Sequence, residues 1–402
     1  MKGFFNKKDL ETDQIACTPI SCASCGLYKD CNTPKMEPYG KFKKGILIIG
    51  TAPGDTDDKK GKPWQGKYGR LLKRELKEFG INLYKDCLCT NAVFCKTKKP
   101  KDNQIASCRS KLINLIKEKK PKLILLFGST ALNSIIGKVW KKKLGGLDRW
   151  RGFQIPDRYF NTWICPVFHP SFVIQREDKE GNLAKVIWKQ DLKKAIDCLN
   201  KEIKYKDESK YITYIESDKH FKSIYPRLMK ADIMSFDYEG TGLKPHKKGH
   251  QITNTSVCIS ETECYSWMNN KYRDILFKKV LQNPKIKKSA HNLSFENMWS
   301  KVLLKAVVAN WYWCSMNTAH ILDNRRGICG LKFQTYVNFG VADYDSEISD
   351  YLVSPKDLGA NAFNKILQFF KEHGEKEALK YCGLDSIYGF KLTLKQMEEI
   401  NG

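Results

Sequence analysis

The sequence contains no long hydrophobic run. No segment of the 402-residue chain approaches the roughly 18 consecutive apolar residues that a membrane span needs. The opening residues, Met1 to Lys8, lack the apolar core of a signal peptide. Internal repeats and low-complexity segments are absent too, which excludes a repeat architecture. We therefore expect a cytoplasmic protein with no membrane partner.

Cysteine, by contrast, is abundant. The chain has 15 cysteines, and in a long chain without an export signal we expect reduced thiols rather than disulfides. Some of these thiols are candidate metal ligands. Apolar residues make up 42% of the chain, which is enough to form two ordinary hydrophobic cores.

Positive charge is concentrated in the first half of the chain. Residues 1–205 contain 42 Lys and Arg against 21 Asp and Glu, a net charge of +21, whereas residues 206–402 contain 28 against 23, a net charge of +5. Basic surfaces gain affinity for nucleic acids by releasing counterions from the phosphates. The asymmetry therefore indicates phosphate binding by the first half, although a merely solubilising surface would give the same composition.

Hydrophobic patterning predicts an α/β first half. Residues 45–49 and 122–127 are short continuous apolar runs, which is typical of strands buried on both faces of a parallel sheet. Helical patterns alternate with these runs, at residues 69–79, 103–119 and 129–136.

A charged stretch marks the expected domain boundary. Residues 200–210 contain little to bury and are the predicted linker. New strands are predicted at 211–215 and 232–238. We therefore expect one domain over residues 1–205 and a second over residues 206–402.

Four cysteines surround a glycine-rich turn. Cys22 and Cys25 form a C-x-x-C pair, Cys95 follows after 69 intervening residues, and Cys108 after 12 more, where it is predicted to open a helix. The turn Gly50-Thr-Ala-Pro-Gly54 lies between them. A C-x-x-C pair alone makes zinc the default metal, so a zinc-stapled domain of another function is one interpretation. An iron–sulfur cluster beside a nucleobase pocket is the other.

The cysteine frame resembles that of the family 4 uracil-DNA glycosylases, which hold a [4Fe–4S] cluster. Three further segments carry the resemblance, which covers about residues 17–200: Gly50-Thr-Ala-Pro-Gly54 through Gly61-Lys-Pro-Trp-Gln-Gly66, Thr90-Asn91, and His169-Pro170-Ser171. The resemblance implies a three-layer α/β/α fold with a central parallel sheet. It also implies a [4Fe–4S] cluster bound by Cys22, Cys25, Cys95 and Cys108.

The same resemblance implies a uracil pocket. A glycosylase extrudes the nucleotide, so it needs a slot that stacks on the freed base and polar groups that read its edge. Trp64 would stack on the base, Asn91 would read its edge, and His169 would donate a hydrogen bond to the departing base as negative charge develops. The base-binding set would be completed by Gly50, Thr51, Ala52, Pro53 and Gly54, whose glycines permit close backbone approach.

Thr51 departs from that family's pattern. Many members have Glu at this position, a carboxylate thought to position the attacking water, and Thr cannot act as a base at neutral pH. Asp55, Asp57 and Asp58 follow on what is predicted to be the same loop. Asp55 is the expected substitute, although an acidic loop tip is often only solvated.

The second half contains paired carboxylates. Asp237 and Glu239 lie two residues apart at the end of an apolar strand, so both side chains should point to one face. Converging carboxylates need cations to neutralise them, and hard oxygen ligands favour Mg²⁺ or Mn²⁺. Two more pairs lie four residues apart on predicted helices: Asn292 with Glu296, and Tyr381 with Asp385.

This order of motifs resembles the DEDDy-type 3′–5′ exonucleases, in particular the proofreading domain of family A DNA polymerases in phages. The segments 320–327 and Gly330-Leu-Lys-Phe333 carry the resemblance further, over about residues 211–402. It implies a ribonuclease-H-like exonuclease fold with a mixed sheet. It also implies that Tyr381 orients the attacking water, while two Mg²⁺ or Mn²⁺ ions are held by Asp237, Glu239, Glu296 and Asp385.

Two residues depart from the exonuclease pattern. Glu296 stands where many relatives have Asp, and its longer side chain can still reach a metal directly or through water. Cys314 occupies a position that is commonly Asp in the related polymerases.

The chain ends 17 residues after Asp385, so we expect no polymerase palm, fingers or thumb. One interpretation is that a family A DNA polymerase is encoded separately and is a partner of this protein, in the host cytoplasm if the chain is phage-encoded. The other is that the chain is part of a longer product. The substrate is expected to be DNA, single-stranded or with frayed 3′ ends. Three hypotheses follow: an enzyme with both activities, an active nuclease whose uracil module only binds, and a DNA-binding polymerase accessory with both sites silent.

Overall fold

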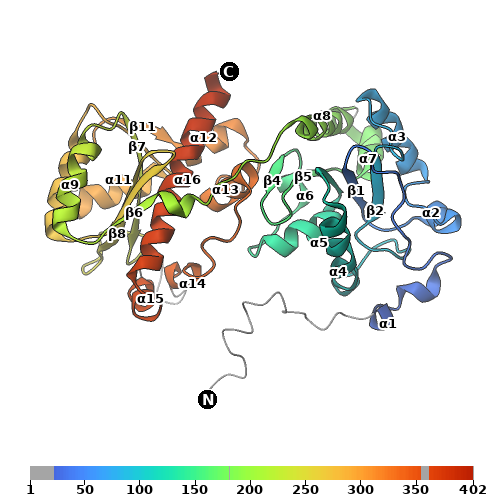
Figure 1. Cartoon of the computed structure of the whole chain (residues 1–402), viewed down its shortest axis with the longest axis horizontal. Coiled ribbons are helices and arrows are strands. Elements are labelled where there is room, and N and C mark those ends of the chain that lie inside the picture. Colours follow the sequence, from blue (N-terminus) through green and yellow to red (C-terminus); the bar gives the residue numbers. More distant parts are fainter. Residues whose placement is uncertain (1–21, 181, 355–361, 402) are drawn as a thin grey trace, which may run out of the picture. The chain divides into compact units, whose positions relative to one another are not determined.

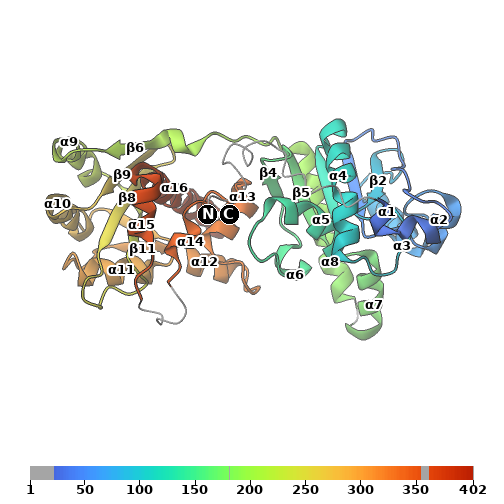
Figure 2. The same cartoon turned by 90° about the horizontal axis from the view of Figure 1, so that it is seen from below.

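A computed structural model of the chain describes residues 22–180, 182–354 and 362–401 (Figures 1 and 2). The chain divides into two units, Met1–Lys204 and Tyr205–Gly402, and each unit has a sheet and a core of its own. Among the described residues, every helix is too short or too polar to cross a lipid bilayer.

The first unit is built on a five-stranded sheet in the order β2-β1-β3-β5-β4. Its strands are β1 (Ile46–Gly50), β2 (Cys87–Asn91), β3 (Leu123–Phe127), β4 (Ile155–Asp157) and β5 (Thr162–Val167). All pairings are parallel except that of β4 with β5. Every residue of β1 and β3 is buried, as their continuous apolar sequences predicted.

Helices cover both faces of this sheet. Leu72 and Trp188, from two different helices, share one core with Ile48 of β1. The helix that contains the buried Leu132 and Ile135 contacts β1 and β3. The predicted three-layer α/β/α fold is confirmed. The helical elements are α1 (Cys22–Cys25), η2 (Leu27–Asp30), α2 (Asp55–Lys60), α3 (Lys67–Glu78), α4 (Asp102–Lys119), α5 (Ser129–Val139), α6 (Leu147–Trp150), α7 (Pro170–Glu180), α8 (Leu183–Asp197) and η3 (Cys198–Asn200).

The second unit has a six-stranded mixed sheet in the order β11-β10-β7-β8-β9-β6. Its strands are β6 (Ile212–Ile215), β7 (Ile233–Gly240), β8 (Ile252–Ser260), β9 (Glu263–Met268), β10 (Lys287–Ala290) and β11 (Trp311–Cys314). Strand β8 is antiparallel to both β7 and β9, and the other pairings are parallel. The mixed sheet expected for this half is confirmed.

One long helix, α16 (Glu375–Asn401), crosses this sheet and contacts β7, β8 and β9; it is drawn in red in Figure 1. Phe221, Phe277 and Trp299 form a separate core with the sheet. The remaining helical elements are η4 (Glu208–Tyr211), α9 (Asp218–Met229), α10 (Lys271–Gln282), α11 (Leu293–Val302), α12 (Ser315–Leu322), α13 (Leu331–Phe339), α14 (Ser349–Leu352) and α15 (Ile366–His373).

Local boundaries differ from the sequence-based prediction at three places. The predicted linker ends early, because the carboxylate of Glu208 is buried against Lys391 (2.9 Å) and the hydroxyl of Tyr388 (3.3 Å). Cys108 lies in the second turn of α4 rather than at its start. Asn292 precedes α11 as its N-cap, with a left-handed φ of 67°, so it shares no helical face with Glu296.

Candidate functional site

A cleft of about 1200 Å³ opens beside the carboxyl ends of the parallel strands of the first sheet. Residues that follow β1, β2 and β5 line it, because parallel strands end at the same edge of a sheet. The predicted base-binding and catalytic side chains lie together here. The lining includes Thr51, Ala52, Pro53, Gly54, Asp55, Trp64, Asn91 and His169.

Gly50, the last residue of β1, lies outside the cleft lining but packs against Trp64 and Asn91, which belong to it. A Cβ atom at residue 50 would lie 2.5 Å from Oδ1 of Asn91 and 2.8 Å from the ring of Trp64. A Cβ at Gly69 would lie 1.8 Å from the carbonyl oxygen of Trp64. Only glycine at these two positions allows Trp64 and Asn91 to approach as closely as they do.

Trp64 is a largely buried aromatic residue in the lining of the cleft. Its indole Nε1 donates a hydrogen bond to the carbonyl oxygen of Thr90 at 3.2 Å, which holds the ring in place. The ring stacks on His169, with a centroid distance of 5.6 Å and an interplanar angle of 29°, and meets Phe127 edge-on at 5.1 Å. The arrangement gives the cleft a rigid aromatic surface.

His169 is held as a neutral hydrogen-bond donor. Burial lowers the pKa of His169 to about 4, so the ring is uncharged at neutral pH. The backbone N–H of Ser171 donates to Nδ1 at 3.2 Å, and the Ser171 hydroxyl lies 2.8 Å from the same atom. Because Nδ1 accepts a hydrogen bond, the ring proton sits on Nε2.

The acidic residues after the turn belong to helix α2, not to a loop as predicted. Asp57 accepts hydrogen bonds from the backbone N–H groups of Gln65 (2.6 Å) and Gly66 (3.2 Å). Asp58 is buried and accepts from the N–H groups of Asn32 (3.0 Å) and Thr33 (2.8 Å). Both carboxylates thus already accept hydrogen bonds from backbone N–H groups.

Asp55 is the exposed carboxylate of the three. Its side chain is 71% exposed and forms an ion pair with Lys96 at 2.9 Å. The hydrogen bond from Lys96, together with its charge, lowers the pKa of Asp55. Asp55 is therefore ionised at the cleft. Sequence reasoning missed Lys96, since nothing in the spacing pairs it with α2.

The four predicted cluster ligands line one small cavity of about 60 Å³, together with Val93 and Phe94. Burial raises the pKa of Cys108 to about 11, and the backbone N–H of Lys35 donates to Sγ of Cys95 at 3.3 Å. These four ligands are Cys22, Cys25, Cys95 and Cys108.

The spacing of these thiols bears on which metal they suit. A tetrahedral zinc with bonds of about 2.3 Å would place its sulfurs about 3.8 Å apart. Among the described residues, three ligand atoms within 4.8 Å of one another occur in the second unit but not at these thiols. No three of these sulfurs therefore lie as close together as one bound zinc ion would require, and four cysteines are a donor set that both zinc sites and [4Fe–4S] clusters use.

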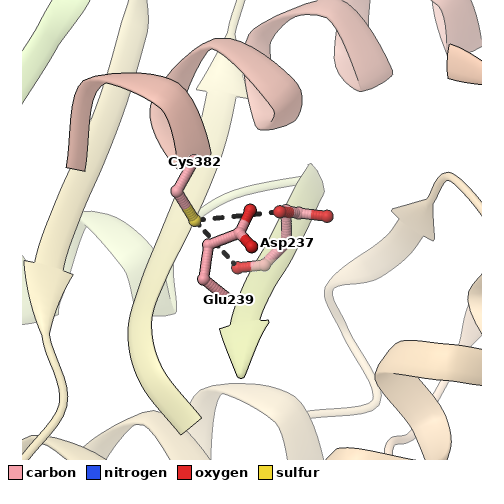
Figure 3. Close-up of side chains that lie close together, drawn as sticks. All are labelled: Asp237, Glu239 and Cys382. Carbon is pink, nitrogen blue, oxygen red and sulfur yellow. Dashed lines mark hydrogen bonds between the residues drawn. The ribbon is translucent and has the colours of Figure 1, made fainter. Parts of the chain in front are cut away.

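In the second unit, Asp237 and Glu239 of β7 point to one face, as the two-residue spacing predicted (Figure 3). One ligand atom from each lies within 4.8 Å of the other and of Sγ of Cys382 on α16. Burial, and then the charge of Asp385, raises the pKa of Asp237 well above its usual value. Burial, and then the charge of Asp237, does the same for Glu239.

Glu296 and Asp385 complete this group of carboxylates. Glu296 is buried, its Oε2 atom has no hydrogen-bond partner, and burial followed by the charge of Asp237 raises its pKa well above the usual value. Several carboxylates in one buried place are stable only when cations or protons neutralise them. The unpartnered oxygen and the hard donor set fit divalent cations such as Mg²⁺ or Mn²⁺.

Asp385 has two partners that sequence reasoning missed. The ammonium group of Lys332 forms an ion pair with it, and the hydroxyl of Tyr344 donates to it at 2.5 Å. The same ammonium lies 4.2 Å from the ring centroid of Tyr381, which stands one helical turn before Asp385 on α16. In the sequence, only the resemblance of segment 330–333 to the exonucleases could have indicated that Lys332 belongs to this site.

Two family models match the chain. Residues 37–193 match the uracil DNA glycosylase superfamily, and residues 212–401 match the family described as 3′-5′ exonuclease.

Curated relatives match the same regions. The type-4 uracil-DNA glycosylase of Thermotoga maritima is 29% identical over 184 residues, which cover 45% of this chain and 91% of the relative. That of Pyrobaculum aerophilum is 28% identical over 171 residues, covering 41% and 85%. The DNA polymerase of Bacillus phage SP01 is 22% identical over 329 residues, covering 74% of this chain and 34% of the polymerase. The chain thus matches about a third of that polymerase's length.

Among solved structures, Escherichia coli RNase D is similar over 47% of this chain and 45% of that chain, with 17% identity and a TM-score of 0.36. Trypanosoma brucei RNase D in complex with GMP is similar over 46% and 57%, with 13% identity and a TM-score of 0.37. From the family models and the curated relatives, the chain joins a uracil-DNA glycosylase superfamily domain with type-4 homologues to a 3′–5′ exonuclease domain similar to part of a phage DNA polymerase.

Proposed function

We propose that this protein excises uracil from DNA with its first domain and removes nucleotides from DNA 3′ ends with its second. The observation that carries the first activity is the convergence of Trp64, Asn91 and His169 on one cleft. The second rests on the buried carboxylates around Asp237. The proposed substrate of both is DNA, single-stranded or with frayed 3′ ends.

Uracil excision would use the cleft as it stands. An extruded base stacks on Trp64 while the amide of Asn91 reads its edge. As the bond between base and sugar breaks, negative charge develops on the uracil, and Nε2–H of His169 donates to that oxygen most strongly in the transition state. Asp55, ionised beside Lys96, would orient the water that attacks the sugar.

Cys22, Cys25, Cys95 and Cys108 would hold the [4Fe–4S] cluster of this domain. When bound, the cluster supplies cross-links between three segments of the chain, which is a structural contribution. Anaerobically purified protein should be brown and contain about four irons and four sulfides. One zinc without sulfide would overturn this assignment.

The exonuclease would use Asp237, Glu239, Glu296 and Asp385 to hold two Mg²⁺ or Mn²⁺ ions. When bound, the cations supply positive charge that stabilises both the attacking and the leaving oxygens at the terminal phosphate. The hydroxyl of Tyr381 would orient the attacking water.

One assay on a 5′-labelled, single-stranded oligonucleotide with a central uracil tests both activities. In EDTA we expect no ladder, but a single break at the uracil after alkali. In Mg²⁺ we expect a ladder that shortens from the 3′ end. His169→Ala should remove the first product and Asp237→Ala the second, and a thymine oligonucleotide controls for base choice. If the wild-type chain gave neither product, the proposal would be overturned.

A second candidate function is a nuclease whose first domain binds uracil without excising it. Two observations favour it: Thr51 stands where many family members have a carboxylate, and Asp55 is paired with Lys96. Binding of the uracil oligonucleotide in EDTA without any alkali-sensitive break would support this alternative. Thr51→Glu should then create the break.

As a wider role, we propose proofreading and repair in partnership with a separately encoded family A DNA polymerase. The proposed location is the cytoplasm, which is that of the host if the chain is phage-encoded. An accessory protein with both sites silent would fail the oligonucleotide assay in every condition while still binding DNA.

A further inference from the structure

A thiol stands among the exonuclease carboxylates. Sγ of Cys382 lies 3.8 Å from Oδ2 and 3.6 Å from the carbonyl oxygen of Asp237 (Figure 3). The same sulfur lies 3.2 Å from Oγ of Ser256. The side chain is fully buried. Cys382 lies on α16, directly after Tyr381. Because α16 packs on β7 and β8, its position on that helix brings the thiol next to Asp237.

The donor set is therefore mixed. Asp237 and Glu239 offer hard carboxylate oxygens, which suit Mg²⁺ and Mn²⁺, whereas Cys382 offers a soft sulfur, which suits Zn²⁺ and Cd²⁺. One atom from each of the three lies within 4.8 Å of the other two. Three protein ligands and one open position are typical of a four-coordinate zinc site.

A second observation indicates that this place receives a cation. Glu296, which belongs to the proposed exonuclease centre, is buried and presents an Oε2 atom without a hydrogen-bond partner. An unpaired buried carboxylate oxygen is costly unless a cation or a proton satisfies it.

We propose that Cys382, with Asp237 and Glu239, binds thiophilic divalent cations, Zn²⁺ or Cd²⁺, in a mode that excludes the catalytic Mg²⁺ or Mn²⁺. The inference rests on the proposed exonuclease centre and adds a regulatory metal to it. On binding, the thiol releases its proton to solvent and the sulfur–metal bond forms. The bound ion takes the carboxylate oxygens that Mg²⁺ needs, so 3′-end digestion stops.

Metal affinity, measured by competition with a chromophoric chelator, tests the proposal on the full-length protein with its cluster. Cys382→Ser should weaken Cd²⁺ binding about tenfold or more, since the loss of even an outer contact costs 10- to 100-fold. Binding of Mn²⁺ should change less than about twofold, because hard ions do not need the sulfur. Cys382→Ala is the second variant, and retained Mn²⁺ affinity shows that each variant keeps the folded site.

Cys264→Ser is the matched control. Cys264 is a buried thiol of the same domain, and its S–H donates a hydrogen bond to the carbonyl oxygen of Gly383 (3.5 Å) rather than to a carboxylate. Its substitution should change neither affinity, and all other thiols are common to every variant. In cadmium-113 NMR, the wild-type chain should show a thiolate-shifted signal that both Cys382 variants lose.

The outcomes separate the two proposals. If Cd²⁺ binds the Cys382 variants as tightly as the wild type while Mn²⁺ also binds, the thiol mode is wrong and the carboxylate centre stands. If the wild-type protein binds neither ion in the second domain, both the centre and the thiol mode are overturned.

Discussion

His169 shows how burial sets the chemistry of one residue. The cleft keeps its ring neutral, and Ser171 fixes the tautomer that donates from Nε2. A neutral donor does not bind ground-state uracil strongly, but its hydrogen bond strengthens as the base becomes an anion. Its contribution should therefore appear in rate more than in affinity.

We predict that His169→Ala lowers the single-turnover excision rate by about 10²- to 10³-fold, as the loss of one oxyanion donor does elsewhere. Affinity for uracil-containing DNA, measured by anisotropy in EDTA, should fall much less. Asp237→Ala serves as the control and should leave excision unchanged. An equal loss of rate and affinity would mean that His169 only holds the base.

The same residue should make the first domain sensitive to acid. The folded-state pKa of His169 is about 4, below the usual 6.5, so between these values the unfolded chain binds a proton that the folded chain does not. The contribution to stability is thus complete above pH 6.5 and is lost as the pH falls towards 4, by about 3 kcal/mol at most. In His169→Asn, the stability of the first domain should fall less steeply as the pH is lowered. Amide hydrogen exchange in β1 and β3 measures that stability. A wild-type slope that survives in His169→Asn would assign the effect to other groups.

At the scale of elements, α13 and α16 are joined through a charge pair. Lys332 of α13 binds Asp385 of α16, and both side chains are largely buried, at 18% and 8% exposure. The ammonium thus supplies positive charge at a place where the proposed metal ions would supply it too. We therefore expect that a cation bound at Asp385 would replace part of the charge that Lys332 supplies between these two helices.

Lys332→Met should accordingly destabilise the second domain by about 3–5 kcal/mol in EDTA, because it leaves a buried carboxylate unpaired. Added Mn²⁺ should recover much of that loss, as followed by thermal unfolding. Lys380→Met is the matched control, since Lys380 pairs with Glu377 at 45% and 41% exposure and such pairs contribute about 0–1 kcal/mol. If the deficit were the same with and without Mn²⁺, Lys332 would be a purely structural cation.

At the scale of the whole molecule, positive charge belongs mainly to the glycosylase-like half. Its net charge is +21 against +5 for the other half, and several of its cations line the cleft, namely Lys67, Arg70, Lys96 and Lys98. We infer that this half supplies most of the DNA affinity. The nuclease would then act on DNA whose binding energy comes from elsewhere in the chain.

Replacing Lys67 and Arg70 with Gln should lower the slope of log affinity against log salt by about 1.4 for single-stranded DNA, which is about 0.7 per phosphate contact. Anisotropy titrations over a range of salt concentrations in EDTA measure the slope. The control pair is Lys117 and Lys120, which are exposed and lie outside the cleft lining. An equal reduction from the control pair would show that charge acts diffusely rather than at the cleft.

Much of this protein could be predicted from local periodicity. Continuous apolar runs located β1 and β3 because strands buried on both faces need apolar side chains at every position. The two-residue spacing of Asp237 and Glu239, and the four-residue spacing of Tyr381 and Asp385, determined shared faces because strands and helices repeat at fixed intervals. Neither inference required knowledge of any distant residue.

Tertiary structure decided which of those groups are available and what stands beside them. Asp57 and Asp58 look like Asp55 in sequence, but Asp57 accepts a hydrogen bond from the backbone N–H of Gln65, eight residues later, and Asp58 from that of Asn32, 26 residues earlier. Cys382 meets Asp237 across 145 positions. The contacts between residues far apart in sequence depend on how α16 packs on β7 and how α2 packs on its neighbours. Packing is a property of the whole core that no local spacing encodes.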